Sequence, residues 1–235
     1  MSLFGYIYVL FPLCPEVSRY MAYLVSCFCL VGSIFVGLSA LYYTDLKKII
    51  AASSIVHMSY AVIGLFSFNP EAVCASVVAM FAHGIISSGL FFSIGSLYNR
   101  YSERDLSFFS NLTGKMSDLG FNFFFLSFAN AAFPATIGYL PEVMILAAST
   151  QYGLYMPVFL LIPLFINGAY NIWAITRLCF GPEKPHQVIE HVEPLSFGEM
   201  YIFYTCFILI LALGFHPSFL MQNIDTTLTF IYAYE

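Results

Sequence analysis

The sequence predicts an all-α, polytopic membrane protein with about six transmembrane helices, the fourth of which is discontinuous. Three observations favour this fold class. Of 235 residues, 60% are hydrophobic and 9% are charged, with a mean hydropathy of +0.83, whereas a soluble domain carries about 25% charged residues. Apolar stretches recur at the length that a bilayer requires, roughly 20 residues per helix. Basic residues gather beside alternate ends of these stretches.

Six apolar stretches are long enough to be transmembrane helices, and they lie near residues 21–43, 49–68, 72–98, 119–150, 154–178 and 197–217. The apolar opening "MSLFGYIYVLFPLCP" is too short for a crossing, so we interpret residues 1–20 as the remnant of a preceding helix and its loop, begun on another polypeptide. Residues 179–196 contain several prolines, which predict a loop rather than a helix. Residues 197–235 hold the last helix and a tail.

The basic residues predict how the chain is oriented. When the six spans alternate in direction, seven basic residues fall at one membrane face: Lys47, Lys48, Arg100, Arg104, Lys115, Arg177 and Lys184. Only Arg19 falls at the other face. The positive-inside rule makes the first face the matrix or the cytoplasm, so residues 179–196 form a matrix-side loop and Glu235 lies opposite.

Polar residues within or at the edge of the spans are candidates for function. Lys47 and Lys48 enter the second span, where they could simply anchor the helix by snorkelling to the interface. His57 lies nine residues beyond Lys48, about 13 Å along a helix and well inside the hydrocarbon layer. His83 stands near the middle of the third span among small residues, which leave room for water. It is either a core histidine donating to a backbone carbonyl or a proton carrier, because histidine titrates near neutral pH.

The stretch "ANAAFPATIGYLPEVMI" predicts a break in the fourth span. Pro134 should end the first half of the helix, the residues up to Gly138 can unwind, and Pro141 suits the start of a second half-helix. Glu142 would then lie in a first turn, where the helix dipole favours the carboxylate while burial favours the protonated form. It is either a proton-exchanging group or an interfacial glutamate at a helix end.

Two classes of partner are disfavoured by composition. The net charge is −5 and no basic stripe is present, which argues against nucleic acid. The six cysteines are scattered through apolar runs without a paired spacing or a histidine cluster, so we expect neither a metal nor a haem site. Membrane lipids are the surroundings that the composition indicates.

Four motifs, taken in order, resemble the antiporter-like subunits of proton-pumping NADH:ubiquinone oxidoreductase (respiratory complex I). They are "DLKKIIAASSIVHM", "MFAHGIISSGLFFSIGSLYNRY", "ANAAFPATIGYLPEVMIL" and "NGAYNIWAITRLCFG", and the likeness runs from about residue 5 to residue 181. It is closest to the branch formed by mitochondrial subunit four and bacterial subunit M. Glu142 distinguishes this branch, because the similar subunits two and five tend to have a lysine there. Ala135 and Pro141 stand where the family usually has glycines.

The resemblance implies a fold and a function. Residues 21–178 would form the second inverted repeat of the antiporter-like fold, followed by one further helix. Lys47, Lys48, His57, His83 and Glu142 fall on family positions associated with proton translocation, with His83 relaying protons to Glu142. The chain would be a multi-pass subunit of complex I in the mitochondrial inner membrane. Flavin, iron–sulfur clusters and quinone would belong to other subunits, and this chain would hold no cofactor or catalytic redox residue.

The resemblance also implies a missing half. Family members contain a first repeat with its own glutamate and lysine, which we expect on a separate chain among the other membrane-arm subunits unless it has been lost. If it has been lost, this chain would be a non-pumping scaffold of the arm. A further alternative is a subunit of a stand-alone cation/proton antiporter, because those proteins share the motifs.

Overall fold

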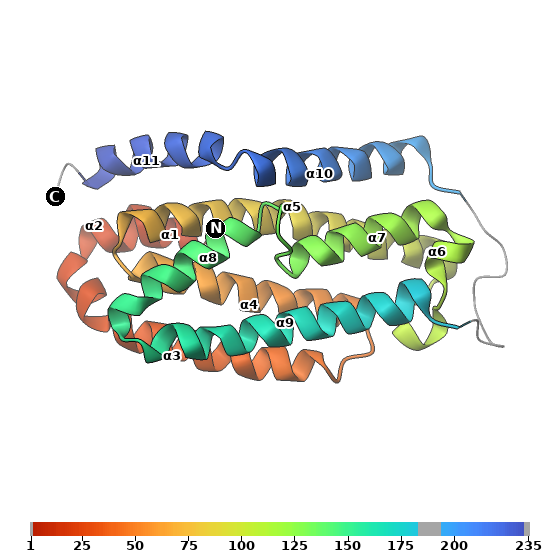
Figure 1. The fold of residues 1–235 in the computed structure, drawn as a ribbon, viewed down its shortest axis with the longest axis horizontal. Helices are drawn as coiled ribbons and strands as arrows, with labels where there is room; N and C mark the ends of the chain where they lie inside the picture. Colours follow the sequence, from red (N-terminus) through yellow and green to blue (C-terminus); the bar gives the residue numbers. More distant parts are fainter. Residues whose placement is uncertain (1, 183–193, 233–235) are drawn as a thin grey trace.

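The computed structural model describes residues 2–182 and 194–232 as a long bundle of helices. Helices run back and forth along one axis, and loops gather at the two ends of the bundle (Figure 1). Except for one isolated bridge between Asp45 and Asp105, the described part of the chain forms helices, turns and loops only. The predicted all-α class is confirmed.

The long helices among the described residues run parallel or antiparallel to one another along the bundle axis (Figure 1). They are α3 (Pro15–Ala40), α4 (Leu46–Phe66), α5 (Pro70–Tyr101), α9 (Tyr155–Phe180) and α10 (Phe197–Phe215), and each is long and apolar enough to cross a membrane. The shorter helices are α6 (Leu112–Lys115), α7 (Ser117–Asn130), α8 (Tyr139–Ala148) and α11 (Ser218–Tyr232), with single turns at Leu106–Phe108 and Ser149–Tyr152. Together with the family described below, these helices make the chain a multi-pass membrane protein.

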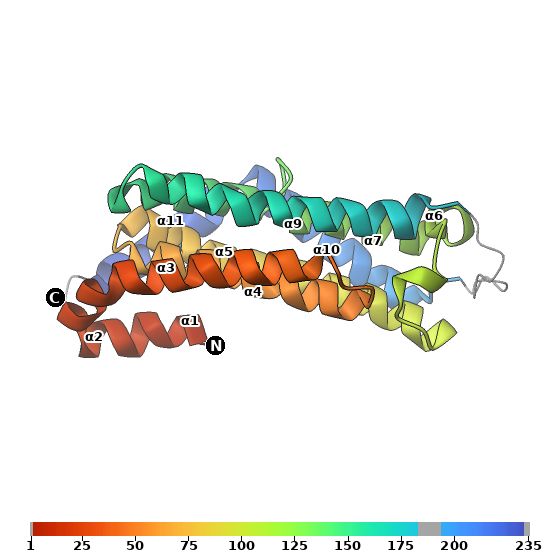
Figure 2. The same ribbon diagram turned by 90° about the horizontal axis from the view of Figure 1, so that it is seen from below.

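Residues before α3 form a short helical arm. It consists of α1 (Ser2–Gly5), a π-helical turn over Tyr6–Leu10 and α2 (Phe11–Leu13). The arm runs to the end of the bundle where α3 begins, and α3 then returns beside it (Figure 2). Leu3, Ile7 and Phe11 are buried in one apolar cluster with α4 and α5. Residues 1–20 were predicted as a remnant of a helix; the arm occupies the first part, but α3 already begins at Pro15.

Side-chain caps fix where several helices begin. Asp45 accepts a hydrogen bond from the backbone N–H of Lys47 at 2.9 Å and starts α4. Asn69 does the same for α5, whose first residue is Pro70. Such caps satisfy N–H groups that have no partner within the helix. They place the polar turns at the bundle ends and leave the helix interiors to apolar contacts.

The fourth predicted span consists of two helices. α7 ends at Asn130 and α8 begins at Tyr139, and the eight residues between them are turns and bends. The two helices follow one another along the bundle axis, so that together they run most of its length (Figure 1). Each is too short to cross a bilayer alone. That they jointly make a sixth crossing stays a prediction.

The second half-helix starts earlier than expected. Pro141 was predicted to open it, but Pro141 is the third residue of α8 and Gly138 directly precedes the helix. Proline is tolerated there because first-turn N–H groups have no acceptor inside the helix. The backbone N–H of Tyr139 instead donates to Thr136 at 3.2 Å, which starts the turn two residues sooner. Pro134 lies inside the interruption, as the sequence predicts.

Two helices cover the outer side of α5 at the end of the chain. The predicted tail after α10 is largely helix α11, which continues along the bundle where α10 stops (Figure 1). Its apolar residues Leu220, Met221 and Ile224 pack against the core. At the other end of α10, Arg100 of α5 donates two hydrogen bonds to Glu199, at 2.8 and 2.7 Å, in a bidentate ion pair. This pair fixes the start of α10 to the end of α5.

Basic residues lie at the helix ends that the sequence predicts. Lys47 and Lys48 are in the first turn of α4, Arg100 and Arg177 are in the last turns of α5 and α9, and Lys115 ends α6. All of these helix ends lie at the same end of the bundle, on the right in Figure 1. Lys184 and Glu235 lie outside the described residues, so the assignment of membrane sides stays a prediction, as does the division of the chain into domains.

Candidate functional site

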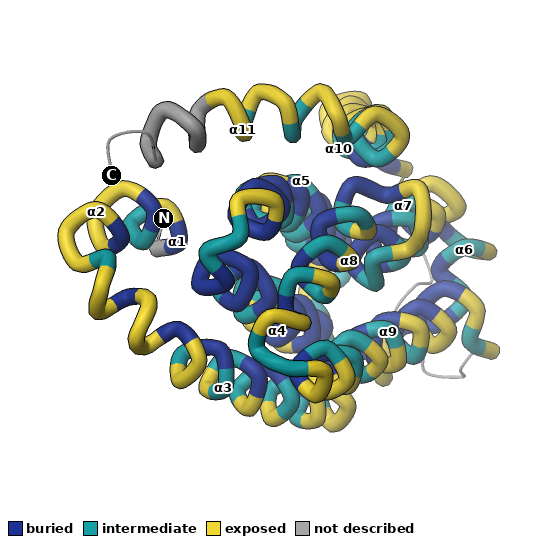
Figure 3. Tube along the Cα trace, turned by 60° about the vertical axis from the view of Figure 1, so that its left-hand side comes forward, coloured by how far each residue is buried: buried dark blue, intermediate teal, exposed yellow. Residues whose placement is uncertain are grey.

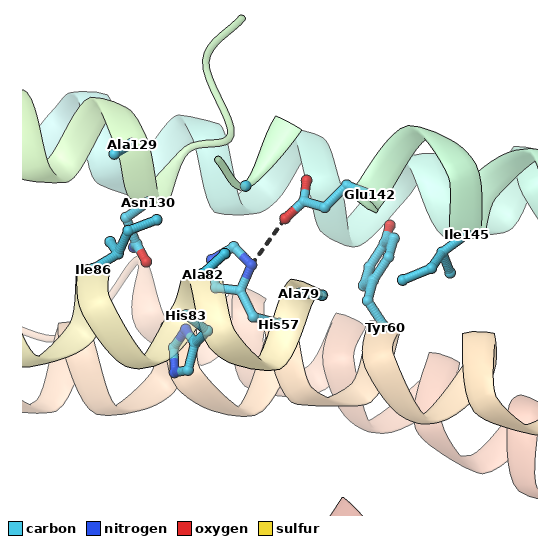
Figure 4. A pocket seen from close by; sticks show the side chains of 11 residues that line it. His57, Tyr60, Ala79, Ala82, His83, Ile86, Ala129, Asn130, Glu142 and Ile145 are labelled. Atoms are coloured by element: carbon cyan, nitrogen blue, oxygen red, sulfur yellow. Dashed lines mark hydrogen bonds and ion pairs between the residues drawn. The ribbon is translucent and has the colours of Figure 1, made fainter. Parts of the chain in front are cut away.

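Glu142 is buried at the centre of the bundle. It is the fourth residue of α8, and its residue is only 8% exposed. Its Oε1 lies 2.9 Å from Nδ1 of His57 on α4 (Figure 4). The other carboxylate oxygen, Oε2, is buried without a hydrogen-bond partner among the described residues. The first turn of α8 places this carboxylate at the positive end of a helix dipole.

The two intramembrane histidines lie next to each other. The ring centroids of His57 and His83 are 5.4 Å apart, with 36° between the ring planes. His57 lies between His83 and Glu142 (Figure 4). The resemblance implied that His83 relays protons to Glu142, and the structure places His57 in contact with the carboxylate. Three titratable side chains from three different helices therefore form one row.

A small cavity adjoins this row of side chains. Its lining comes from α4, α5, α7, α8 and the break between the last two: His57, Tyr60, Ala79, Ala82, His83, Ile86, Ala129, Asn130, Gly138, Glu142 and Ile145. About 20 Å³ of it is open to the centre of a water molecule. One water needs about 10–15 Å³ of such space, so there is room for about one ordered water beside the carboxylate.

A network of asparagine side chains covers the other side of His57. Asn167 and Asn171 lie one turn apart on α9, and Asn130 is the last residue of α7. Nδ2 of Asn167 lies 3.4 Å from Nε2 of His57 and 3.1 Å from the backbone oxygen of Asn130. Nδ2 of Asn130 donates to Oδ1 of Asn171 at 3.0 Å, and the hydroxyl of Tyr170 donates to Oδ1 of Asn167. The network joins the helix break to the histidine.

Lys47 and Lys48 are not part of this arrangement. Both are exposed in the first turn of α4. His57 is ten residues beyond Lys47, about 15 Å along the helix. Their position fits the anchoring interpretation that the sequence left open. Arg177, at the same end of the bundle, lies 4.8 Å above the ring of Trp173.

Sequence reasoning missed the asparagine network. Asn167, Tyr170 and Asn171 were noticed only as part of a family motif, and Asn130 only as part of the broken stretch. A usable signal was present, since Asn167 and Asn171 are four residues apart and therefore share one face of an apolar helix. Amides at that depth must bond to one another or to other polar groups.

Comparison with known proteins identifies the family. A family model described as "NADH:quinone oxidoreductase/Mrp antiporter, TM" matches residues 1–166. The chain belongs to this family. The resemblance predicted from the four motifs is thereby confirmed.

Curated relatives of the family share modest identity with the chain. NADH-ubiquinone oxidoreductase chain 4 of Chondrus crispus is 34% identical over 221 residues, which are 94% of this chain and 45% of that protein. NADH-quinone oxidoreductase subunit M of Rhodobacter capsulatus is 29% identical over 215 residues, 92% of this chain and 42% of that protein. The chain thus spans less than half the length of these relatives.

Solved structures share the fold. Respiratory complex I from Thermus thermophilus with bound NADH contains a chain that superposes with a TM-score of 0.87 at 20% identity, covering 97% of this chain and 49% of that one. A chain of the Mrp complex from Dietzia sp. DQ12-45-1b gives 0.80 at 16% identity, covering 92% and 48%. At these identities the likeness establishes the fold alone.

Proposed function

We propose that this chain is a membrane-arm subunit of a proton-pumping NADH:ubiquinone oxidoreductase and supplies half of an antiporter-like proton-translocation module. The observation that carries the proposal is the buried row of His83, His57 and Glu142 beside a helix break. Ionisable groups are costly inside a membrane and generally mark proton or ion pathways. The curated relatives named above support the choice of enzyme.

The geometry allows a stepwise transfer of a proton. A proton accepted by His83 can pass to His57, either directly between the adjacent rings or through a water in the cavity. From Nδ1 of His57 it can pass to Oε1 of Glu142 across 2.9 Å. Oε2 of Glu142 faces no protein donor or acceptor among the described residues, so it is the atom from which the proton can leave. No bond other than N–H and O–H changes.

We further propose partners and a location. The redox groups, which are flavin, iron–sulfur clusters and quinone, belong to other subunits of the complex. The other half of the relatives' length, carried by the same or a separate polypeptide, would supply the first repeat. The mitochondrial inner membrane is proposed because chain 4 relatives are numerous among the matches and the chain is a multi-pass membrane protein.

Substitution of Glu142 by Gln tests the proposal. The change keeps the volume and one acceptor oxygen but removes the titratable proton, so NADH-driven proton uptake into vesicles should fall roughly tenfold or more. His83→Ala should have a similar effect, and the double variant should be far from additive because the residues act as a unit. Native gels establish that each complex is assembled.

Glu71→Gln is the matched control, because Glu71 is exposed in the first turn of α5. It should pump like the wild type. Normal pumping by an assembled Glu142→Gln complex would refute proton transfer through this residue and leave the chain as a scaffold of the membrane arm.

The second candidate function is a subunit of a stand-alone cation/proton antiporter. The fold shared with the Mrp complex chain favours it. Purification of the native complex discriminates the two functions. NADH oxidation and quinone reduction that co-purify with this chain support the first, whereas sodium/proton exchange without quinone reduction supports the second.

A further inference from the structure

One side-chain amide bridges the helix break and the proposed proton path. Nδ2 of Asn167 lies 3.1 Å from the backbone oxygen of Asn130 and 3.4 Å from Nε2 of His57. The carbonyl of Asn130 needs this donor, because its partner in a continuous helix would be the N–H of Pro134, and proline has none. The sequence feature that breaks the helix is therefore also the one that requires the amide.

Neighbouring groups fix which end of the Asn167 amide faces His57. The backbone oxygen of Asn167 accepts from Nδ2 of Asn171 at 2.9 Å, and a carbonyl can only accept, so the Asn171 amide has one orientation. Its Nδ2 then lies 3.0 Å from Oδ1 of Asn167, which also accepts from Tyr170. A flipped Asn167 would place its NH₂ group against the NH₂ group of Asn171, and its oxygen against the backbone oxygen of Asn130. Its NH₂ group must face Asn130 and His57.

We infer that Asn167 is a positioning residue that selects the protonation state of His57. An N–H directed at Nε2 requires that this nitrogen be unprotonated, and the ring proton then resides on Nδ1, 2.9 Å from the carboxylate of Glu142. The amide thus directs the only proton of the neutral ring toward the acceptor. It also opposes a second proton on Nε2. The inference rests on the proposed function, and it adds a residue that controls where His57 carries its proton.

This arrangement couples proton arrival to the helix break. A proton that comes from His83 to Nε2 of His57 meets the N–H of Asn167 and can bind only when that contact opens. The same amide group holds the end of α7 through Asn130. Loading His57 with a second proton therefore acts on the same amide group that donates to the last residue of α7. The other titratable side chains beside His57 are Glu142, His83 and Tyr60, all of which line the cavity.

Nitrogen NMR on the intact complex tests the inference directly. Complex containing ¹⁵N,¹³C-labelled histidine is measured in membranes at neutral pH, and the resonances of His57 are assigned by their loss in His57→Gln. We expect an unprotonated Nε2, identified through its coupling to Cδ2, and a protonated Nδ1. A proton on Nε2 in the resting wild-type complex would overturn the inference.

Variants of the network provide the second test. Asn167→Leu removes the N–H donor, so the ratio of protonated to unprotonated Nε2 should rise roughly fivefold or more, the effect of losing one hydrogen bond. If that complex fails to assemble, Asn167→Asp keeps the shape and places an acceptor oxygen beside Nε2, with the same expected rise. An unchanged ratio in the assembled variant contradicts the inference.

Tyr170→Phe is the matched control. It removes one donor to Oδ1 of Asn167 but leaves Asn171 in place to orient the amide, so Nε2 should remain unprotonated. The protonation state is read without any pumping assay. The inference can therefore fail while Glu142→Gln still abolishes pumping, and it can hold while Glu142→Gln pumps normally.

Discussion

The centre of the bundle and its outer surface are opposite in character. Around the centre, most residues of α4 are buried and α5 and α8 turn buried faces inward, whereas α3, α10 and α11 present exposed residues outward (Figure 3). The exposed side chains of α3 are largely apolar: Phe28 is 71% exposed and Phe35 is 72%. Buried positions near the centre instead hold carboxylate and amide groups, Glu142 and Asn167 among them.

This difference shows which forces act in each region. At the surface, apolar side chains suit the hydrocarbon of a membrane or the apolar face of a neighbouring subunit, and their precise shape matters little. At the centre, each polar group needs a partner contributed by another helix, as His57, Glu142 and Asn167 do for one another. Stability should therefore fall when a charge is introduced at the surface, and when helices are displaced slightly at the centre.

The largest effect on stability should come from a charge on the outer surface. Phe28 lies midway along α3, and Phe28→Asp should destabilise the protein by about 2.5–3.5 kcal/mol, the cost of an aspartate at the centre of a transmembrane helix. Tyr42→Asp is the control, because Tyr42 is 87% exposed just beyond the end of α3. Assembly on native gels measures both. Equal assembly of the two variants would mean that α3 faces water.

Close packing at the centre should give the next largest effect. A methyl group added at Gly64 of α4 would lie 2.1 Å from Oγ of Ser76 and 2.8 Å from Cγ1 of Ile145, so α5 and α8 would have to move. Gly64→Ala should destabilise the protein by about 1–3 kcal/mol. The thermal midpoint of the purified complex is the measurement. Gly84→Ala, with nothing within 4 Å of the added carbon, should cause no loss.

The smallest effect should be a gain in stability at the helix break. Ala135 has a φ of +74°, in the left-handed region that costs a residue with a side chain about 1–2 kcal/mol. Ala135→Gly should therefore raise stability, by about 0.5–1 kcal/mol after the larger chain entropy of unfolded glycine is subtracted. Ala147→Gly, inside α8, should lower it instead. A lower thermal midpoint for Ala135→Gly would contradict this account.

Much of the site could be predicted from residue type and depth. His57, His83 and Glu142 stood out because ionisable residues are rare in apolar spans, and Pro134 marked the break. Depth along a helix follows from the rise per residue, but the direction in which a side chain points depends on how helices rotate against one another. The sequence alone therefore could not predict that Glu142 pairs with His57 rather than with His83.

The parts that were missed depend on contacts between distant segments. Residues of α11 were predicted as a tail because the segment carries too many polar residues for a span, although a few apolar ones pack against α5. α8 begins at Tyr139 because the backbone oxygen of Thr136 accepts a hydrogen bond within the break. No residue in the sequence predicted a helix start at this position. Lys47 has the residue type of a proton carrier but an exposed position at a helix end.

The contact between α10 and the helix break has a mechanical consequence. A methyl group at Gly214 would lie 2.3 Å from the carbonyl oxygen of Ala135, so the last turn of α10 rests directly on the backbone of the break. The first turn of α10 is tied to α5 through Arg100 and Glu199. α10 is therefore held at its first turn by an ion pair and at its last turn by close contact with the backbone of the break. A shift of the Ala135 backbone toward Gly214 would therefore press on the last turn of α10, which lies at the outer face of the molecule.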